Sequence, residues 1–111
     1  METSFYKPEQ DEIVIFFLNE LKKNISENLK NVILYGSRAR GDFFKHSDYD
    51  FLIILKKKNL QIKELIYDIG YEVLDVFEKL ASCIIWDEEE WETKKDFSLG
   101  KNIQNDGIVL L

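Results

Sequence analysis

The chain has 111 residues, 45% of them hydrophobic and 14% aromatic, so we expect one folded domain over residues 1–111 rather than disorder. Its 15 basic and 21 acidic residues give a formal charge of −6, which disfavours general binding to DNA or RNA. No apolar run approaches the roughly 20 residues of a membrane-spanning helix, and the N-terminal residues lack the pattern of a secretory signal. We therefore expect a cytoplasmic protein that does not bind membranes.

The N-terminal half predicts a helix followed by two strands. Apolar residues at spacings of three and four predict a helix over about residues 8–29. A short apolar run over 31–36 stops at glycine and is typical of a buried strand. A polar loop over 36–47 follows, and residues 48–55 form the most strongly predicted strand of the chain.

The C-terminal half continues with a long amphipathic helix over residues 60–80, one apolar face of which ends with Val76, Phe77 and Leu80. Residues 82–86 predict a third strand, and the acidic run 87–90 suits a helix N-terminus rather than a metal site. A short helix over about 98–105 and an edge strand over 108–111 complete the order. Helices alternating with strands in this way predict an α/β domain with a small sheet.

The residues suited to phosphate and metal chemistry are concentrated between positions 36 and 50. Asp48 and Asp50 lie two apart on a predicted strand, so their carboxylates share one face, where a divalent cation such as Mg²⁺ would offset their repulsion. Upstream, Gly36 and Ser37 follow a strand and open a turn whose amides suit an anion. Carboxylates for a metal beside donors for a phosphate predict a phosphoryl- or nucleotidyl-transfer site.

The full stretch resembles a known family signature. Gly-Ser, ten residues, then Asp-x-Asp is the signature of the DNA polymerase β-like nucleotidyltransferases. The fuller form, Gly-Ser-x-Ala-Arg-Gly ending in Ser-Asp-x-Asp, is similar to the minimal nucleotidyltransferase (MNT) branch. The resemblance implies a polymerase β palm-like nucleotidyltransferase fold, with a small mixed sheet flanked by helices.

The same resemblance implies roles for individual residues. Asp48 and Asp50 would be catalytic and hold Mg²⁺, with two ions possible, while ATP or another NTP would be the substrate. The nucleotide-binding residues would be Gly36, Ser37, Arg38, Arg40 and Ser47, although Arg40 equally suits a salt bridge to Asp42. His46 occupies a position that the family motif leaves variable, and we expect it to be structural or solvent-facing.

One position departs from the family pattern. These enzymes carry a third carboxylate on the strand after the long helix, and in this chain Ser82 occupies that position, with Asp87 at the far end of the strand. Three functions remain open. The first is transfer of AMP from ATP to a hydroxyl on a partner protein, as in the antitoxins of HEPN–MNT toxin–antitoxin pairs, whose partner is a small helical HEPN protein. The second is a catalytically degenerate nucleotide-binding module that masks or regulates its partner by binding, and the third is a nucleotide sensor.

A second apolar stripe lies on the long helix, away from its core face. It consists of Tyr67, Tyr71 and Leu74. An exposed aromatic stripe predicts a protein interface, whereas the alternative is that the C-terminal segment folds over it. Self-association is a further possibility that the sequence leaves open.

Overall fold

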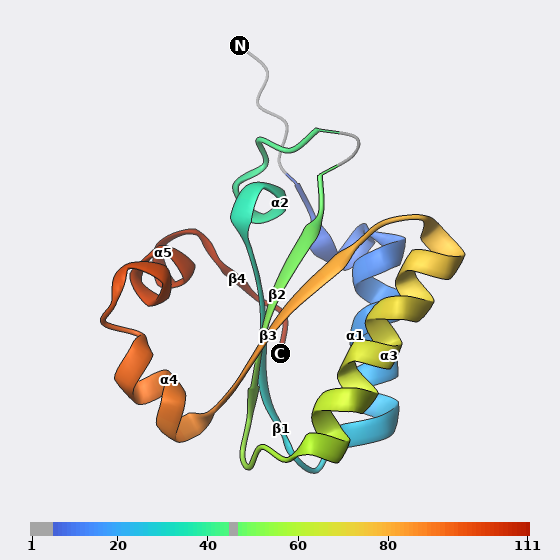
Figure 1. The fold of residues 1–111 in the computed structure, drawn as a ribbon. Coiled ribbons are helices and arrows are strands. Elements are labelled where there is room, and N and C mark those ends of the chain that lie inside the picture. The colour runs from blue at the N-terminus through green and yellow to red at the C-terminus, as the bar shows by residue number, and fades with distance from the viewer. Residues whose placement is uncertain (1–5, 45–46) are drawn as a thin grey trace.

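The computed structural model describes residues 6–44 and 47–111, so His46 lies outside the described residues and its expected role stays a prediction. Figure 1 shows a sheet between two layers of helices. None of the described helices is long and apolar enough to cross a membrane. In chain order, the elements are a 3-10 turn Pro8–Gln10, α1 (Glu12–Ile25), β1 (Leu29–Tyr35), α2 (Gly36–Arg40), β2 (Tyr49–Leu55), α3 (Leu60–Phe77), β3 (Ala81–Asp87), α4 (Glu88–Lys94), α5 (Ser98–Asp106) and β4 (Ile108–Val109).

The sheet is mixed, as the resemblance implies. Its four strands run in the order β3-β2-β1-β4, with β1 antiparallel to both β2 and β4, and β2 parallel to β3. The parallel pair requires a crossover, which α3 supplies. Helices α1 and α3 cover one face of the sheet, and α4 and α5 cover the other (Figure 1).

The centre of the sheet is β2, which is buried on both faces because it is apolar at nearly every position. Phe51 and Ile53 point into the larger core beneath α1 and α3, where Phe51 stacks on Phe17 with ring centroids 4.2 Å apart. Leu52 and Ile54 point into a smaller core beneath α4 and α5. Asp50, two residues before Leu52, therefore belongs to the α4–α5 face of the sheet.

Several predicted boundaries are wrong. The first helix is shorter than predicted, because Asp11 caps it by accepting a hydrogen bond from the Ile13 amide, and because Leu29 already pairs with Leu55 in the sheet. The stretch 36–47 is not entirely a loop, since its first five residues form α2.

The long helix also ends earlier than predicted. It ends at Phe77, and Glu78 adopts a left-handed conformation whose amide donates to the Leu74 carbonyl oxygen. Val76, in the last turn of α3, and Leu80, beyond its end, were predicted to lie on the core face but are 62% and 47% exposed.

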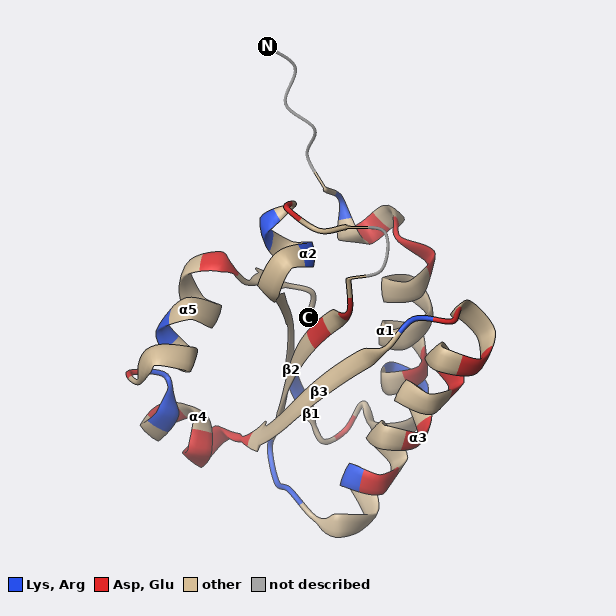
Figure 2. Cartoon of the chain, turned by 45° about the horizontal axis from the view of Figure 1, so that its top comes forward, with Lys and Arg blue, Asp and Glu red and all other residues tan. Residues whose placement is uncertain are grey.

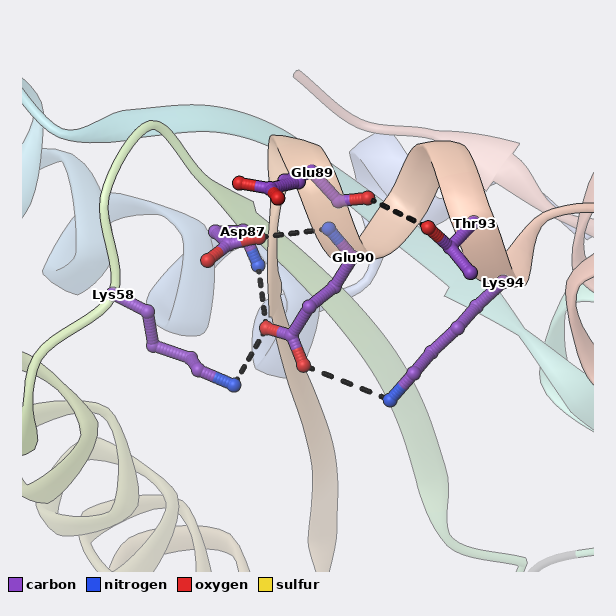
Figure 3. Close-up of polar contacts among 6 residues, drawn as sticks. All are labelled: Lys58, Asp87, Glu89, Glu90, Thr93 and Lys94. Carbon is purple, nitrogen blue, oxygen red and sulfur yellow. Dashed lines mark hydrogen bonds and ion pairs between the residues drawn. The ribbon is translucent and has the colours of Figure 1, made fainter.

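The acidic run after β3 caps a helix, as predicted. Asp87 and Glu90 form a reciprocal capping box at the start of α4, with each side chain accepting a hydrogen bond from the other residue's amide (Figure 3). Glu90 also pairs with Lys58, at 2.6 Å, and with Lys94. These contacts connect the β2–α3 turn to α4 and hold the C-terminal end of β3.

Candidate functional site

The two aspartates of the motif lie together where β1 ends and β2 begins. Asp50 pairs with Tyr35 across the antiparallel ladder, and Gly36 follows Tyr35 directly. A Cβ atom on Gly36 would collide with Oδ2 of Asp50, and the backbone of Gly36 has φ = 77°. Glycine is therefore required for two reasons, since the conformation is left-handed and the main chain closely approaches the Asp50 carboxylate.

Asp50 carries an electrostatic strain that a cation would relieve. Burial raises the pKa of its carboxyl group, and the neighbouring Asp48 raises it further, whereas the charge of Arg40 lowers it. Asp48 is exposed and Asp50 is half-buried, so the pair faces solvent from a partly desolvated position. Two ionised carboxylates so placed are favourable only with a positive charge between or beside them.

The two arginines of the motif have different surroundings. Arg38 is only 6% exposed, and its guanidinium lies between the rings of Phe43 and Tyr49, 4.2 and 4.3 Å from their centroids. It also donates a hydrogen bond of 3.0 Å to the carbonyl oxygen of Ser47. Its geometry therefore fits a residue that positions the segment leading to Asp48 better than it fits an open phosphate contact.

A second set of contacts holds the hydroxyl group of Tyr49 at the start of α1. The hydroxyl groups of Tyr49 and Tyr6 both donate hydrogen bonds to Oδ2 of Asp11, and each donor–acceptor distance is 2.7 Å. Burial and these bonds to a carboxylate raise the pKa of both phenols far above 10. The side chain of Asp11 thus caps α1 and anchors Tyr49, the first residue of β2, which lies between Asp48 and Asp50 in the sequence.

Arg40, in contrast, is exposed. Its guanidinium pairs with Asp42 at 3.2 Å, as the sequence suggested, and with Asp106 of α5 at 3.8 Å. Of the two arginines, it is the one whose charge acts on Asp50. Figure 2 shows basic and acidic residues around α2 and the adjoining end of the sheet. Exposed ion pairs of this kind are weak, so Arg40 can exchange its partners for a phosphate at little cost.

The two serines of the motif also differ. Ser37 lies in the first turn of α2, and its carbonyl oxygen accepts hydrogen bonds from the amides of Gly41 and Asp42. The hydroxyl oxygen of Ser47 accepts a hydrogen bond from the Phe44 amide, which closes the turn before β2. Ser47 therefore contributes both its hydroxyl and its carbonyl group to the shape of the loop.

Position 82 lies beside the aspartate pair, as the sequence predicts. Ser82 is the direct partner of Asp50 in the parallel ladder, and its side chain is exposed. Asp87 pairs with Leu55 at the opposite end of β3 and is engaged in the capping box. Across residues 6–44 and 47–111, no group of three or more His, Cys, Asp or Glu side chains is placed to hold a metal ion.

Sequence reasoning missed Tyr35. Burial and the charge of Asp50 raise the pKa of this phenol to about 12, so Tyr35 stays protonated as a wall of the site. The sequence contained a signal for this role, because Tyr35 directly precedes Gly36 at the end of β1. In an antiparallel pair, the end of β1 lies beside the start of β2, where Asp50 is. The roles of Asp11 and Asp106 had no comparable signal, since both depend on long-range packing.

The match to known proteins decides the family. Residues 17–109 match the family described as "Nucleotidyltransferase domain", which is most of the chain. The chain belongs to this nucleotidyltransferase family. The matched range includes every residue of the motif and both strands that border it.

The nucleotidyltransferase has related sequences in Methanocaldococcus jannaschii. It is 31% identical to "Putative protein adenylyltransferase MJ0604" over 94 residues, which is 85% of this chain and 90% of that protein. It is 40% identical to "Putative protein adenylyltransferase MJ0141" over 78 residues, 66% of this chain and 79% of that one. Among solved structures, it resembles a toxin–antitoxin with AMP-PNP at a TM-score of 0.64 and 16% identity, covering 87% of this chain and 71% of the other, which supports the fold alone.

The donor set of the nucleotidyltransferase suits Mg²⁺ held partly by a substrate. Two carboxylates, one of them with a raised pKa, provide hard oxygen ligands and excess negative charge. Mg²⁺ commonly takes one or two carboxylates and completes its shell with water and substrate phosphates. The arrangement does not provide an all-protein cage, so we expect metal and nucleotide to bind together.

Proposed function

We propose that this nucleotidyltransferase transfers AMP from ATP to a hydroxyl group on a partner protein, with Asp48 and Asp50 holding Mg²⁺. We further propose that it is the antitoxin of a HEPN-type toxin, which would be the partner. The observation that carries the proposal is the Asp48–Asp50 pair beside the close approach of Gly36 to Asp50. The related putative protein adenylyltransferases and the toxin–antitoxin among the structural neighbours support the choice of reaction and partner.

In this proposal each residue of the site has a limited task. Asp48 and Asp50 hold the metal ion, which when bound neutralises charge on the transferring phosphoryl group. Gly36 keeps the backbone close to that group, and Arg40 leaves Asp42 and Asp106 to contact a phosphate. Arg38 and Ser47 act at one remove, by fixing the segment that carries Asp48.

Removal of the proton from the attacking hydroxyl group is the difficult step. As that oxygen bonds to the α-phosphorus and pyrophosphate leaves, the proton must pass to a base. Ser82, opposite Asp50, is not a base at neutral pH, and Asp87 is at the wrong end of β3. Because general-base assistance is worth about 10²–10⁴-fold in rate, we expect slow transfer by the free chain.

This same observation favours a second candidate function. A chain that keeps the phosphate and metal ligands but lacks the third carboxylate suits a catalytically degenerate module, which binds a nucleotide and masks or regulates its partner by binding. The two candidates share the nucleotide site and differ only in chemistry, so a binding measurement and a transfer measurement separate them.

Isothermal titration calorimetry with ATP and MgCl₂ tests the shared part. We expect the double variant Asp48→Asn, Asp50→Asn to weaken binding by roughly 100-fold. The control Asp68→Asn, an exposed carboxylate on α3, should bind like wild type. Equal affinity in the wild type and the double variant would refute the metal site. Label transfer from α-³²P-ATP to the partner then supports the enzyme, whereas tight binding without transfer supports the degenerate module.

A further inference from the structure

Three apolar side chains of α3 are exposed on one side of the helix. Tyr67, Tyr71 and Leu74, which we call the α3 patch, are 42%, 63% and 44% exposed. The C-terminal segment does not cover them, because β4 pairs with β1 at the opposite edge of the sheet. The sequence-based alternative of a covered stripe is therefore wrong, and the patch is open to solvent.

The α3 patch adjoins an open strand edge. A Cβ atom on Gly70 would lie 3.5 Å from the Ala81 carbonyl oxygen, so this face of α3 touches the start of β3. Tyr67 and Leu74 lie three residues before and four residues after Gly70, on neighbouring positions of the helix surface. In the part of the chain that the structure describes, β3 pairs only with β2 and forms the sheet edge.

The edge lacks two of the usual protections against pairing. From Ala81 to Trp86 it contains no charged residue and no proline, the two devices that commonly keep an edge strand from pairing with another chain. Ser82, in this same stretch, is the ladder partner of Asp50. Because Ser82 and Asp50 belong to the α4–α5 face, a protein seated on the α3 patch and this edge would reach the aspartate pair by extending around the edge of β3.

The charge of α3 selects the kind of partner. Along the helix, one base, Lys63, accompanies four acids: Glu64, Asp68, Glu72 and Asp75. Figure 2 shows the acidic residues along α3. A second copy of this chain would bring two acidic helices together, whereas a partner with lysine and arginine around an apolar centre would complement them.

We propose that the α3 patch, together with the outer edge of β3, is the docking face for a different protein that presents an apolar centre with a basic rim. A part of the docked protein that extends around the β3 edge onto the α4–α5 face would bring its acceptor hydroxyl to Asp48 and Asp50. Only this last step rests on the proposed function, because the docking itself requires no chemistry.

The experiment measures binding of the purified HEPN-type toxin of the proposed pair, by biolayer interferometry at low and high salt. Tyr71→Glu should weaken binding by roughly tenfold or more, as at an interface centre. The control is Phe97→Glu, a side chain 64% exposed before α5 on the other face of the sheet, and it should bind like wild type. Melting curves of both variants should match the wild type.

Charge reversal provides the second arm and does not depend on the aromatic residues. Glu64→Lys with Asp75→Lys should weaken binding and reduce its salt dependence, whereas Glu27→Lys, exposed in the turn after α1, should not.

Four results would overturn the proposal: Tyr71→Glu binding at full strength, binding indifferent to salt, no binding of the toxin, or a homodimer that Tyr71→Glu dissociates. The ATP and MgCl₂ titration needs no partner, so it decides the nucleotide site separately.

Discussion

Two glycines with the same backbone conformation but different surroundings allow a sharp test of the site. Gly36 and Gly41 have φ values of 77° and 84°. Around Gly41 there is open space for a Cβ atom, whereas at Gly36 the new atom meets Oδ2 of Asp50 and lies 3.3 Å from its Cγ. Gly36→Ala and Gly41→Ala therefore share the backbone cost, and only Gly36→Ala disturbs the aspartate.

The stability effects of the two variants should be nearly equal. A left-handed conformation costs an L-residue roughly 1–2 kcal/mol, which lowers the melting temperature by roughly 4–8 °C per kcal/mol in domains of up to 100 residues and by slightly less at this length. The Asp50 carboxylate is the end of a side chain and can rotate away from a new methyl group at small cost. Rotation, however, removes it from its place beside Asp48, so the main loss should be in metal-dependent nucleotide affinity.

Thermal unfolding and calorimetry with ATP and MgCl₂ measure the two effects on the same samples. We expect similar falls in melting temperature, with affinity weakened roughly 10–100-fold in Gly36→Ala and kept in Gly41→Ala. If Gly36→Ala binds ATP with Mg²⁺ as tightly as Gly41→Ala does, the position of Asp50 does not matter for binding. That result would refute the reasoning about this site, whatever the stability change.

Three further predictions concern other features of the site. Ser82→Asp should increase label transfer to the partner by adding a carboxylate opposite Asp50, and slower transfer would refute position 82 as the place of the missing carboxylate. Arg38→Lys should lower the free energy of unfolding in urea by about 1–3 kcal/mol, because the planar guanidinium group between the two rings is lost. Arg40→Lys should lower it by less than about 0.5 kcal/mol and chiefly weaken ATP binding. The reverse order would contradict a positioning role for Arg38 and a phosphate-binding role for Arg40. Because the pKa of Asp50 is raised, the folded state binds its proton more tightly than the unfolded state, and stability falls as pH rises from 3.8 through that raised pKa. Asp50→Asn should therefore melt at a higher temperature than wild type at pH 7 without Mg²⁺, with the difference lost below pH 3.8, and an unchanged melting temperature at pH 7 would refute the strain.

The sequence predicted the parts of this protein that depend on local pattern. The apolar run of β2 is confirmed, because a strand buried on both faces needs apolar residues at successive positions. The position of Ser82 beside the aspartate strand, which the family resemblance implied, is also confirmed, since Ser82 pairs with Asp50. Arg38 and Arg40 could not be told apart, since they are two residues apart in one motif. Only the three-dimensional placement of Phe43 and Tyr49 makes one arginine buried and the other exposed.

The prediction of where the long helix ends was wrong for a different reason. The apolar residues Val76 and Leu80 continue the 3.6-residue period, so the pattern alone extends the helix and its core face. The chain instead leaves the helix at Glu78 in order to enter β3 beside Tyr49, and a left-handed residue other than glycine gives no signal in the sequence. Tertiary geometry overrode periodicity at this point.

The unequal thickness of the two helical layers has a consequence for motion. Among the residues that the structure describes, the core beneath α1 and α3 joins sixteen buried residues, whereas that beneath α4 and α5 joins five. Local opening requires less free energy where fewer apolar contacts are lost, so amide hydrogens of α4 and α5 should exchange faster than those of α1 and α3. The aspartate pair lies on this thinner side, and α5 holds Arg40 through Asp106. A ligand that breaks the ion pair between Arg40 and Asp106 would speed amide exchange in α5, whereas a ligand that leaves the pair intact would slow it. Hydrogen exchange therefore reports whether the ligand breaks this ion pair.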